Sequence, residues 1–421
     1  MNRMPLTNQL PYRFHEPRHH PFCVWLGKLV ARRMARREHR VEDVEIVGEE
    51  HVRTLLGKGD GVLLTPNHTD HADSFMMFEL SRRVDLPFYY MAAYQIFQGT
   101  REWFLPRVGV FPVDREGSDL TAFKTGVEIL ARGRNPLVVF PEGEIYHLGD
   151  RVTPLREGAL ALAATAAKKL ACAGKTVWVV PVGMKYRFLE DHDPTPALHD
   201  LMDELERRAT WWLQRDRPLV ERLYHYARGM INLKEYEYLG EPQRGELPER
   251  LASLREFILR RVEARRLPPE GKRKEVYDAL CVPERVKELR RACLETLAAP
   301  ETTPALAREL RKDLHDLFVA AQTFSYPGDY VRECPTLERV AETLMKFEED
   351  FLGVFEVAPR GPRKALVHLG EPIDVGSRLA AAGKPRLAVP ALTSELESRI
   401  QTLLDAIGPG RTIANHTSTK E

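Results

Sequence analysis

The feature that most constrains the fold is an alternation of short β-rich runs with helical patterns over residues 41–189. Runs rich in β-branched and aromatic residues lie at 44–48, 61–66, 87–93, 108–113, 136–141 and 176–184. Helical patterns separate several of these runs, at 72–84, 118–132 and 156–172. This alternation predicts a mostly parallel β-sheet covered by helices. Sheets of this kind carry their functional side chains on the loops that follow the strands.

Residues 190–363 have a different texture, in which one helical pattern follows another with little β pattern. Apolar residues recur at helical spacing in two segments of this region, at Leu251, Leu254, Ile258 and Val262 and at Leu337, Val340, Leu344, Phe347 and Phe351. Thr336 is suited to cap the second of these helices. A strand-like segment at 364–375 and a helix at about 393–406 then follow. The chain is therefore expected to be an α/β domain with a long all-α insertion before its last strand.

The predicted organisation has five parts, and the first of them is an N-terminal basic amphipathic helix. The parts are the N-terminal segment at 1–40, the α/β core at 41–189, the helical insertion at 190–363, the return to the core at 364–408 and a disordered tail at 409–421. The amphipathic helix would place apolar residues on one face, namely Phe22, Trp25, Leu26, Leu29 and Val30, with charge supplied by Lys28, Arg32, Arg33, Arg36 and Arg37. Two interpretations are open: a helix docked on the protein's own core, or a helix lying on an anionic membrane surface.

Composition narrows the class of protein. The chain has 421 residues, of which 43% are apolar and 29% charged, as in a soluble globular protein. A net charge of +1 argues against general attraction to nucleic acid. Five dispersed cysteines without C-x-x-C spacing argue for a reducing compartment and against a disulfide framework. With no apolar run long enough to span a membrane and no signal peptide, the protein is expected to be cytoplasmic.

The segment "TPNHTDHADS" at 65–74 places two histidines and two aspartates directly after an apolar run. His68 and Asp73 could not meet on a regular helix, because five residues rotate about 140° around the axis. They could meet if His68 lay on the turn after the strand and Asp73 in the first turn of the next helix, with Thr69 or Asp70 as the cap. A histidine oriented by a carboxylate has its other ring nitrogen free to accept a proton. A metal site using His68, His71 and Asp73 and a purely structural loop histidine are the alternatives.

Two further segments also end in turns that carry charged residues. In "VVFPEGE" at 138–144, Pro141 and Gly143 favour a turn that would present Glu142 at its tip. In "GVFPVDR" at 109–115, Arg115 follows the strand, and its planar guanidinium suits a phosphate or a carboxylate. A solvated surface arginine is the alternative for Arg115.

Taken in order, these motifs resemble the glycerolipid acyltransferase family, whose best-known members are the lysophosphatidic acid acyltransferases. The family's H-x-x-x-x-D motif is matched by His68 and Asp73, its G-x-x-x-x-x-R motif by Gly109 and Arg115, its F-P-E-G motif by Phe140, Pro141, Glu142 and Gly143, and its proline-containing apolar strand by Pro181. The resemblance covers residues 41–189 and 364–375. The helical insertion and the N-terminal 40 residues lie outside it.

The resemblance implies a direct acyl transfer. His68 would remove the proton from an acceptor hydroxyl, Asp73 would hold the imidazole, and the hydroxyl would attack the thioester of acyl-CoA or acyl-carrier protein. Arg115 would bind an anionic group of a lysolipid acceptor, 1-acylglycerol-3-phosphate, while Glu142 and Gly143 shape the pocket. Neither a metal nor a bound cofactor is implied. The expected setting is the inner face of the membrane, with the protein bound peripherally.

One departure from the family concerns the acceptor. The family commonly follows F-P-E-G with Thr or Ser and then Arg, whereas this chain has Glu144, which should repel phosphate. Lys185 and Arg187 could compensate if they pointed inward, and a solvated strand end is the alternative for both. The competing functions are an acyltransferase or thioesterase for a soluble or non-phosphate acceptor, and a non-catalytic interaction protein that uses the helical insertion.

Overall fold

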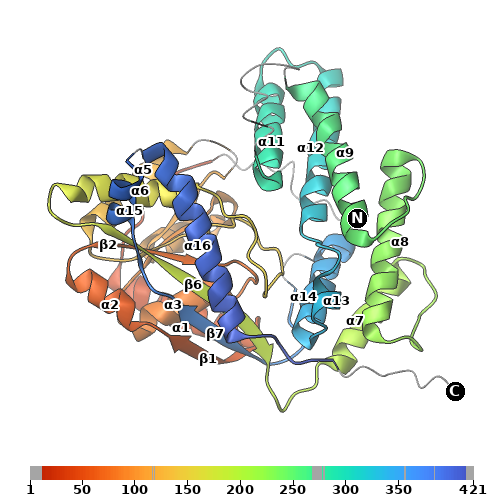
Figure 1. Cartoon of the computed structure of the whole chain (residues 1–421), viewed down its shortest axis with the longest axis horizontal. Helices are drawn as coiled ribbons and strands as arrows, with labels where there is room; N and C mark the ends of the chain where they lie inside the picture. Colours follow the sequence, from red (N-terminus) through yellow and green to blue (C-terminus); the bar gives the residue numbers. More distant parts are fainter. Residues whose placement is uncertain are drawn as a thin grey trace. The chain divides into compact units, whose positions relative to one another are not determined.

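The computed structural model describes residues 12–413, apart from 116, 118, 268–276, 278–279, 355–356 and 384. It divides into two compact units (Figure 1). One unit, the α/β unit, comprises Leu10–Pro194 and Ala358–Arg411. The other, the helical unit, comprises Thr195–Val357 together with the described terminal residues Thr412 and Ile413. The predicted segments at 1–40 and 409–421 lie partly outside the described residues, because 1–11 and 414–421 are not described.

An eight-stranded sheet forms the centre of the α/β unit. Its strands are β1 (Val41–Val47), β2 (Gly61–Pro66), β3 (Tyr89–Ala93), β4 (Val110–Val113), β5 (Leu137–Val138), β6 (Val177–Phe188), β7 (Arg363–Leu369) and β8 (Ile373–Asp374). The spatial order is β1-β7-β6-β2-β5-β3-β4, and β8 pairs with β6. The run from β6 to β4 is parallel, whereas β7 and β8 are antiparallel to β6. The predicted mostly parallel sheet is confirmed. The insertion precedes two strands instead of one, since the segment at 364–375 divides into β7 and β8.

Helices cover both faces of the sheet (Figure 1). One face carries α1 (Pro21–Arg37), α2 (Glu50–Gly57) and α3 (Asp73–Arg83), and the other carries α5 (Leu120–Arg132), α6 (Gly158–Ala171), α15 (Val375–Ala382) and α16 (Pro385–Ile407). The alternation of side chains along β2 connects the two layers, because Val62 and Leu64 join the core under α3 while Leu63 joins the core under α6. The short α4 (Thr100–Phe104) lies between β3 and β4.

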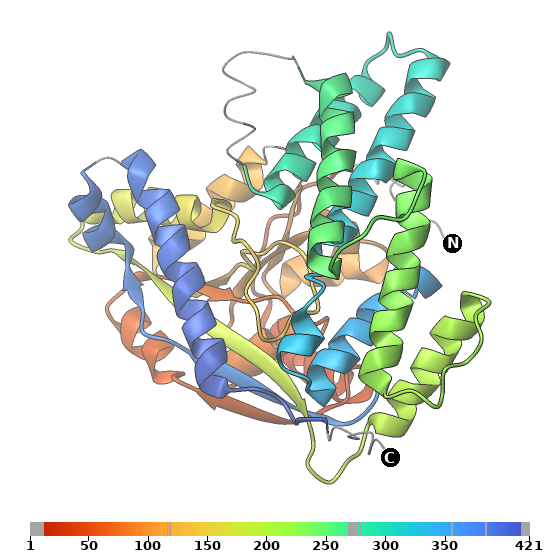
Figure 2. The ribbon, with the colours of Figure 1, turned by 45° about the vertical axis from the view of Figure 1, so that its right-hand side comes forward.

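The helical unit contains only helices among its described residues. They are α7 (Thr195–Arg208), α8 (Leu219–Leu239), α9 (Leu247–Arg266), α11 (Val282–Ala298), α12 (Pro304–Phe324), α13 (Tyr330–Glu333) and α14 (Leu337–Phe347), followed by a π-helical turn at Glu348–Leu352. Helices α9 and α12 pack side by side (green and cyan in Figure 2), and α9 buries Leu254, Ile258 and Val262 of the predicted stripe. Thr336 accepts a hydrogen bond from the backbone N–H of Arg339, which confirms the predicted N-cap.

Buried ion pairs specify how these helices pack. The Arg222 guanidinium, fully buried on α8, donates to Asp203 and Glu206 of α7, with each N···O distance 2.7 Å. Arg250 of α9 pairs in the same way with Glu235 of α8, at 2.6 Å. Because an unpaired buried charge is costly, such pairs disfavour any other register between the helices.

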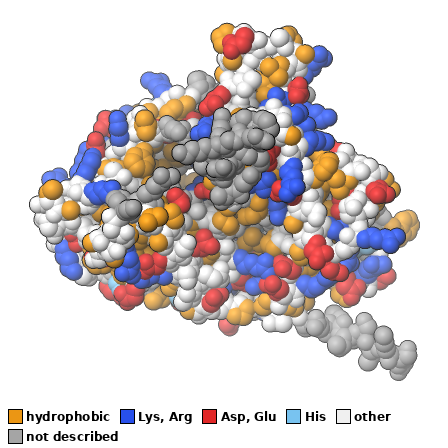
Figure 3. Space-filling view, turned by 45° about the horizontal axis from the view of Figure 1, so that its top comes forward, with side chains coloured by type: hydrophobic (Ala, Val, Ile, Leu, Met, Phe, Trp, Pro, Cys, Tyr) orange, Lys and Arg blue, Asp and Glu red, His pale blue; other side chains and the backbone are white. Residues whose placement is uncertain are grey.

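The N-terminal helix α1 docks through small residues and not through its predicted apolar face. Its buried positions are Cys23, Gly27, Ala31 and Ala35, spaced four apart, and the helix packs on α3. The bulky residues Phe22, Trp25 and Leu29 remain 61%, 61% and 55% exposed. Among the described residues, no helix has the length and hydropathy needed to cross a membrane. Basic and acidic side chains are interspersed over the face drawn in Figure 3, in keeping with the small net charge.

Candidate active site

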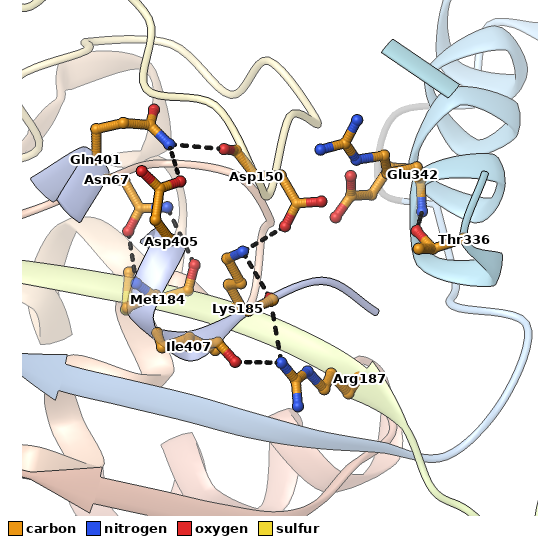
Figure 4. Close-up of polar contacts among 12 residues, drawn as sticks. Asn67, Asp150, Met184, Lys185, Arg187, Thr336, Glu342, Gln401, Asp405 and Ile407 are labelled. Atoms are coloured by element: carbon orange, nitrogen blue, oxygen red, sulfur yellow. Dashed lines mark hydrogen bonds and ion pairs between the residues drawn. The ribbon is translucent and has the colours of Figure 1, made fainter. Parts of the chain in front are cut away.

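The loop after β2 carries His68, and Asn67 fixes where that loop begins. The backbone N–H of Asn67 donates to the Val182 carbonyl at 3.2 Å. Its side-chain amide donates to the Met184 carbonyl at 3.0 Å and accepts from the Met184 N–H at 2.7 Å (Figure 4). The β2–β6 ladder is thereby extended by a side chain, so His68 leaves the sheet at a defined point.

His68 and Asp73 meet across this loop. The His68 Nδ1 atom lies 2.9 Å from Oδ2 of Asp73, which is fully buried at the first position of α3. The same oxygen accepts the backbone N–H groups of Thr69 at 2.7 Å and Asp70 at 3.0 Å. In the described part of the chain no hydrogen-bond partner occupies His68 Nε2, and the side chain is partly exposed. The imidazole is therefore held through Nδ1, with Nε2 available to a substrate.

The remaining groups around this pair do not match the alternative of a metal bound by His68, His71 and Asp73. Asp73 uses both carboxylate oxygens as hydrogen-bond acceptors, since Oδ1 accepts from the Tyr186 hydroxyl at 2.7 Å. The His71 ring lies beside that of His147, with centroids 6.1 Å apart. The arrangement around Asp73 is that of a carboxylate satisfied by N–H and O–H donors.

The F-P-E-G segment supports His68 from the other side. The Phe140 ring packs on the imidazole, with centroids 4.3 Å apart. Glu142 is 1% exposed, so the expectation that it stands at an exposed tip is wrong. Its Oε1 accepts the His68 backbone N–H at 2.8 Å, and its Oε2 accepts the Thr153 hydroxyl. Burial raises the pKa of Glu142 to about 7. Glu142 thus joins the His68 loop to the segment after β5 instead of facing solvent.

Two arginines converge on the turn at Gly143. Arg115 donates to the Gly143 carbonyl, and the Arg156 guanidinium lies against the Gly143 Cα, where a Cβ would come within 2.7 Å of its Nε. One carboxylate oxygen of Glu144 lies 3.3 Å from Arg115 and 4.0 Å from Arg156. The cation that faces Glu144 alongside Arg115 is therefore Arg156, which the motif analysis did not identify as a site residue.

Lys185 and Arg187 bind the end of α16. Lys185 pairs with Asp150 and donates to the Gly408 carbonyl at 3.0 Å, and Arg187 donates to the Ile407 carbonyl (Figure 4). The alternation of side chains along β6 explains this placement, since Lys185 and Arg187 point to the face opposite Met184 and Tyr186. Their charges are thus engaged by a carboxylate and by helix-terminal carbonyls, as expected near a helix C-terminus.

Gly109 and Pro181 occupy positions where the sheet needs a particular backbone. Gly109 precedes β4, at the opposite end from Arg115, and has φ +88°, with an added Cβ only 2.6 Å from the Phe88 carbonyl oxygen. Pro181 lies opposite Thr65 of β2, and its carbonyl accepts the Gly370 N–H at 2.9 Å, between the stretches of β6 that pair with β7 and β8. A residue without an N–H donor fits this break in the pairing.

Besides Arg156, two more site residues were missed by the motif analysis. Tyr186 contacts Asp73 as described, and the buried Arg363 at the start of β7 donates to both oxygens of Asp70, at 2.7 and 3.3 Å. Burial alone would raise the pKa of Asp70, but the charge and hydrogen bonds of Arg363 hold that pKa well below its usual range. The period-two pattern of β6 could have placed Tyr186 on the α3 side. No local signal pointed to Arg363.

The comparison with protein families agrees with this arrangement. Residues 43–185 match the sequence model of a family described as Acyltransferase. No curated protein matches the chain at a significant level. The matched segment runs from β1 into β6 and contains His68, Asp73, Arg115 and Glu142. Residues 43–185 are therefore a domain of the glycerolipid acyltransferase family, and the protein is an acyltransferase.

Proposed function

We propose that this acyltransferase moves a fatty acyl group from an acyl thioester to the free hydroxyl of 1-acylglycerol-3-phosphate, with His68 as the general base. The observation that carries the proposal is the contact between His68 Nδ1 and Asp73. This contact leaves Nε2, the other ring nitrogen of His68, available to a substrate. The donor is acyl-CoA, with acyl-carrier protein as the alternative.

The transfer follows from the position of the imidazole. Nε2 accepts the proton of the acceptor hydroxyl while the oxygen attacks the thioester carbonyl, because a free alcohol is a poor nucleophile at neutral pH. The new C–O bond forms, the C–S bond breaks, and the imidazolium returns its proton to the departing thiolate. Asp73 stabilises the charged ring meanwhile. No metal or cofactor is required, because the thioester already activates the acyl group.

The acceptor phosphate is assigned to the two arginines at Gly143. Arg115 and Arg156 face one oxygen of Glu144, so that they offer two guanidinium groups to a single anionic group. The Glu144 contacts are partly exposed, and pairs of this kind contribute only about 0.2–1 kcal/mol. Hydrogen bonds from arginine to a phosphate are worth about 1.5–3 kcal/mol each. A phosphate can therefore displace Glu144 from between the arginines.

The exposed side of α1 is assigned to an anionic membrane surface. Phe22, Trp25 and Leu29 project from the side opposite the docked small residues, and Arg32 and Arg36 follow on the same helix. Aromatic and basic residues in this combination favour the interface between headgroups and acyl chains. A peripheral position would give the site access to a lysolipid.

Product analysis with labelled acyl-CoA and a lysolipid panel tests the proposal. Wild-type protein should acylate lysophosphatidic acid, and His68→Ala should lose about 10²–10⁴-fold in rate while remaining folded. His71→Ala is the matched control and should retain most of the activity. Acylation of a soluble alcohol only, or release of free fatty acid only, would support the soluble-acceptor or thioesterase alternative. Full activity of His68→Ala would refute the assignment of the base.

A further inference from the structure

The second oxygen of Asp73 has a dedicated partner. Oδ1 accepts from the Tyr186 hydroxyl at 2.7 Å, while Oδ2 serves His68 and two backbone N–H groups. Burial, and then the negative charges of Asp73 and Asp70, raise the pKa of Tyr186 well above its ordinary value. The hydroxyl therefore keeps its proton and acts as the donor in this contact.

Arg363 in turn holds Tyr186 and the catalytic loop together. Its guanidinium lies over the Tyr186 ring, 4.6 Å from the ring centroid, and donates to both oxygens of Asp70. It also donates to the His39 carbonyl at 3.0 Å. Asp70 uses Oδ1 to accept the Ala72 N–H at 2.8 Å, just before α3 begins. One buried cation thus contacts both the partner of Asp73 and the loop that carries His68.

We propose that Tyr186 is a positioning residue for the His68–Asp73 pair, and that Arg363 acts through it, an inference that rests on the proposed role of His68. A carboxylate can turn about its Cβ–Cγ bond, and each turn moves the oxygen that His68 needs. Because Tyr186 donates to Oδ1 and backbone N–H groups donate to Oδ2, only one orientation of the Asp73 carboxylate makes every one of these hydrogen bonds. The orientation of the imidazole then follows from that of the carboxylate.

The two positioning residues come from the strands on either side of the helical insertion. Tyr186 lies near the end of β6 and Arg363 at the start of β7, where Phe188 pairs with Arg363. Both follow the matched family segment, which ends at residue 185. The catalytic pair is accordingly completed by residues that the insertion separates in sequence and the sheet brings together.

Tyr186→Phe is the decisive variant, because it removes one hydroxyl and keeps the ring under Arg363. Turnover should fall about tenfold or more, as for the loss of a hydrogen bond to a charged group, with the donor KM unchanged. Without the Tyr186 donor, Asp73 would hold the imidazolium more strongly, so the acid limb of the kcat–pH profile should move to higher pH. Tyr90→Phe is the matched control, because Tyr90 is buried in the same core and does not contact Asp73.

The other titratable and charged groups near the pair must be followed in the same profiles. They are Glu142 after β5, Asp70 and His147 beside the loop, and Arg363 on β7. Glu142→Gln combined with Tyr186→Phe should show the same displacement of the acid limb as Tyr186→Phe alone. A displacement that disappears in the double variant would attribute the effect to Glu142 and overturn the proposal.

Arg363→Lys tests whether Arg363 acts through Tyr186, since it keeps the charge and loses the planar fork and the stacking. Its loss of turnover should not add to that of Tyr186→Phe, and additive losses would overturn this part of the proposal. If Arg363→Lys does not fold, the turnover and pH profile of Tyr186→Phe decide whether Tyr186 positions the His68–Asp73 pair. An inactive His68→Ala enzyme beside a Tyr186→Phe enzyme with wild-type turnover and pH profile would refute the positioning role alone. An active His68→Ala enzyme would refute the proposed function.

Discussion

Glu142 is a single residue whose burial has a measurable consequence for stability. The pKa of its carboxyl is raised to about 7, above the value of 4.5 that an exposed glutamate has. Between these two values the folded protein binds more protons than the unfolded chain, so the free energy of unfolding should fall as the pH rises from about 4.5 to 7. The part of this loss due to Glu142 should be about 3 kcal/mol, since each pKa unit corresponds to about 1.4 kcal/mol.

Urea unfolding at pH 5 and pH 7.5 checks this prediction when the wild type and Glu142→Gln are compared. The amide cannot ionise, so the variant should lose less stability over this interval. Thr153→Val is a second variant for this test, because it removes the hydroxyl that donates a hydrogen bond to the Glu142 carboxylate. Without that donor the ionised form of Glu142 should be less stable than in the wild type. Equal pH dependence in wild type and Glu142→Gln would contradict the prediction.

The two arginines at Gly143 make a second prediction at the residue scale. Binding of sn-glycerol 3-phosphate, followed calorimetrically, should weaken about tenfold in Arg115→Gln and in Arg156→Gln. Glu144→Gln should strengthen binding, because the competing carboxylate is removed. Arg187→Gln is the control, since Arg187 binds the carbonyls at the end of α16. Loss of binding in Arg187→Gln alone would place the phosphate elsewhere.

At the scale of elements, helix α1 divides its two faces between docking and solvent. The small residues at Cys23, Gly27, Ala31 and Ala35 permit a close approach, which a longer side chain would prevent. An added Cβ at Gly27 would lie 3.1 Å from Val108. The bulky residues Phe22, Trp25 and Leu29 on the other face remain more than half exposed, as the proposed contact with a membrane surface requires.

Replacing Phe22, Trp25 and Leu29 together with Ser should abolish flotation with anionic vesicles. Each such side chain is worth about 1.5–3 kcal/mol when fully buried, and each nearby basic residue adds about 1 kcal/mol. Leu120→Ser is the matched control, because Leu120 is 66% exposed on α5, on the other face of the sheet. The triple variant should unfold at the same urea concentration as the wild type. Unchanged flotation would make α1 an element of the core only.

For the whole molecule, the prediction concerns the independence of the α/β unit. The backbone N–H of Leu189 donates to the Pro362 carbonyl at 3.1 Å, and Phe188 pairs with Arg363, so the insertion leaves and returns at neighbouring positions. Antiparallel strands in this arrangement can be joined by a two-residue turn. Replacing residues 190–361 with Asn-Gly should give a soluble α/β unit that unfolds cooperatively.

Circular dichroism during urea unfolding measures this outcome. Shortening the loop also lowers the entropy lost on closing it, so the replacement should cost the sheet little stability. A variant that aggregates, or unfolds without a cooperative transition, would show that the α/β unit depends on the helical unit for its core. Tyr186 and Arg363 lie outside the replaced segment, so their contacts should remain in the shortened chain, which makes it a second background for testing them.

The sequence by itself determined the α/β class, the all-helical insertion and the Thr336 cap. It also singled out His68 and Asp73 and the turn at Gly143. Each of these depends on residues within a few positions of one another, where periodicity, capping and turn chemistry act. It left open whether the bulky face of α1 docks on the core or lies on a membrane surface, because hydropathy alone does not say which side of a helix finds a neighbour.

Only the tertiary structure decided the contacts between distant parts of the chain. Arg363 meets Asp70 across 293 positions in sequence, and Arg156 meets Glu144 through the fold of the loop after β5. Contacts between distant segments also pair Lys185 with Asp150 and bury Glu142. A side chain's neighbours, and therefore its exposure, are set by how the layers pack on the sheet. Local spacing indicates which face of the sheet a side chain takes, but not which distant residue it meets there.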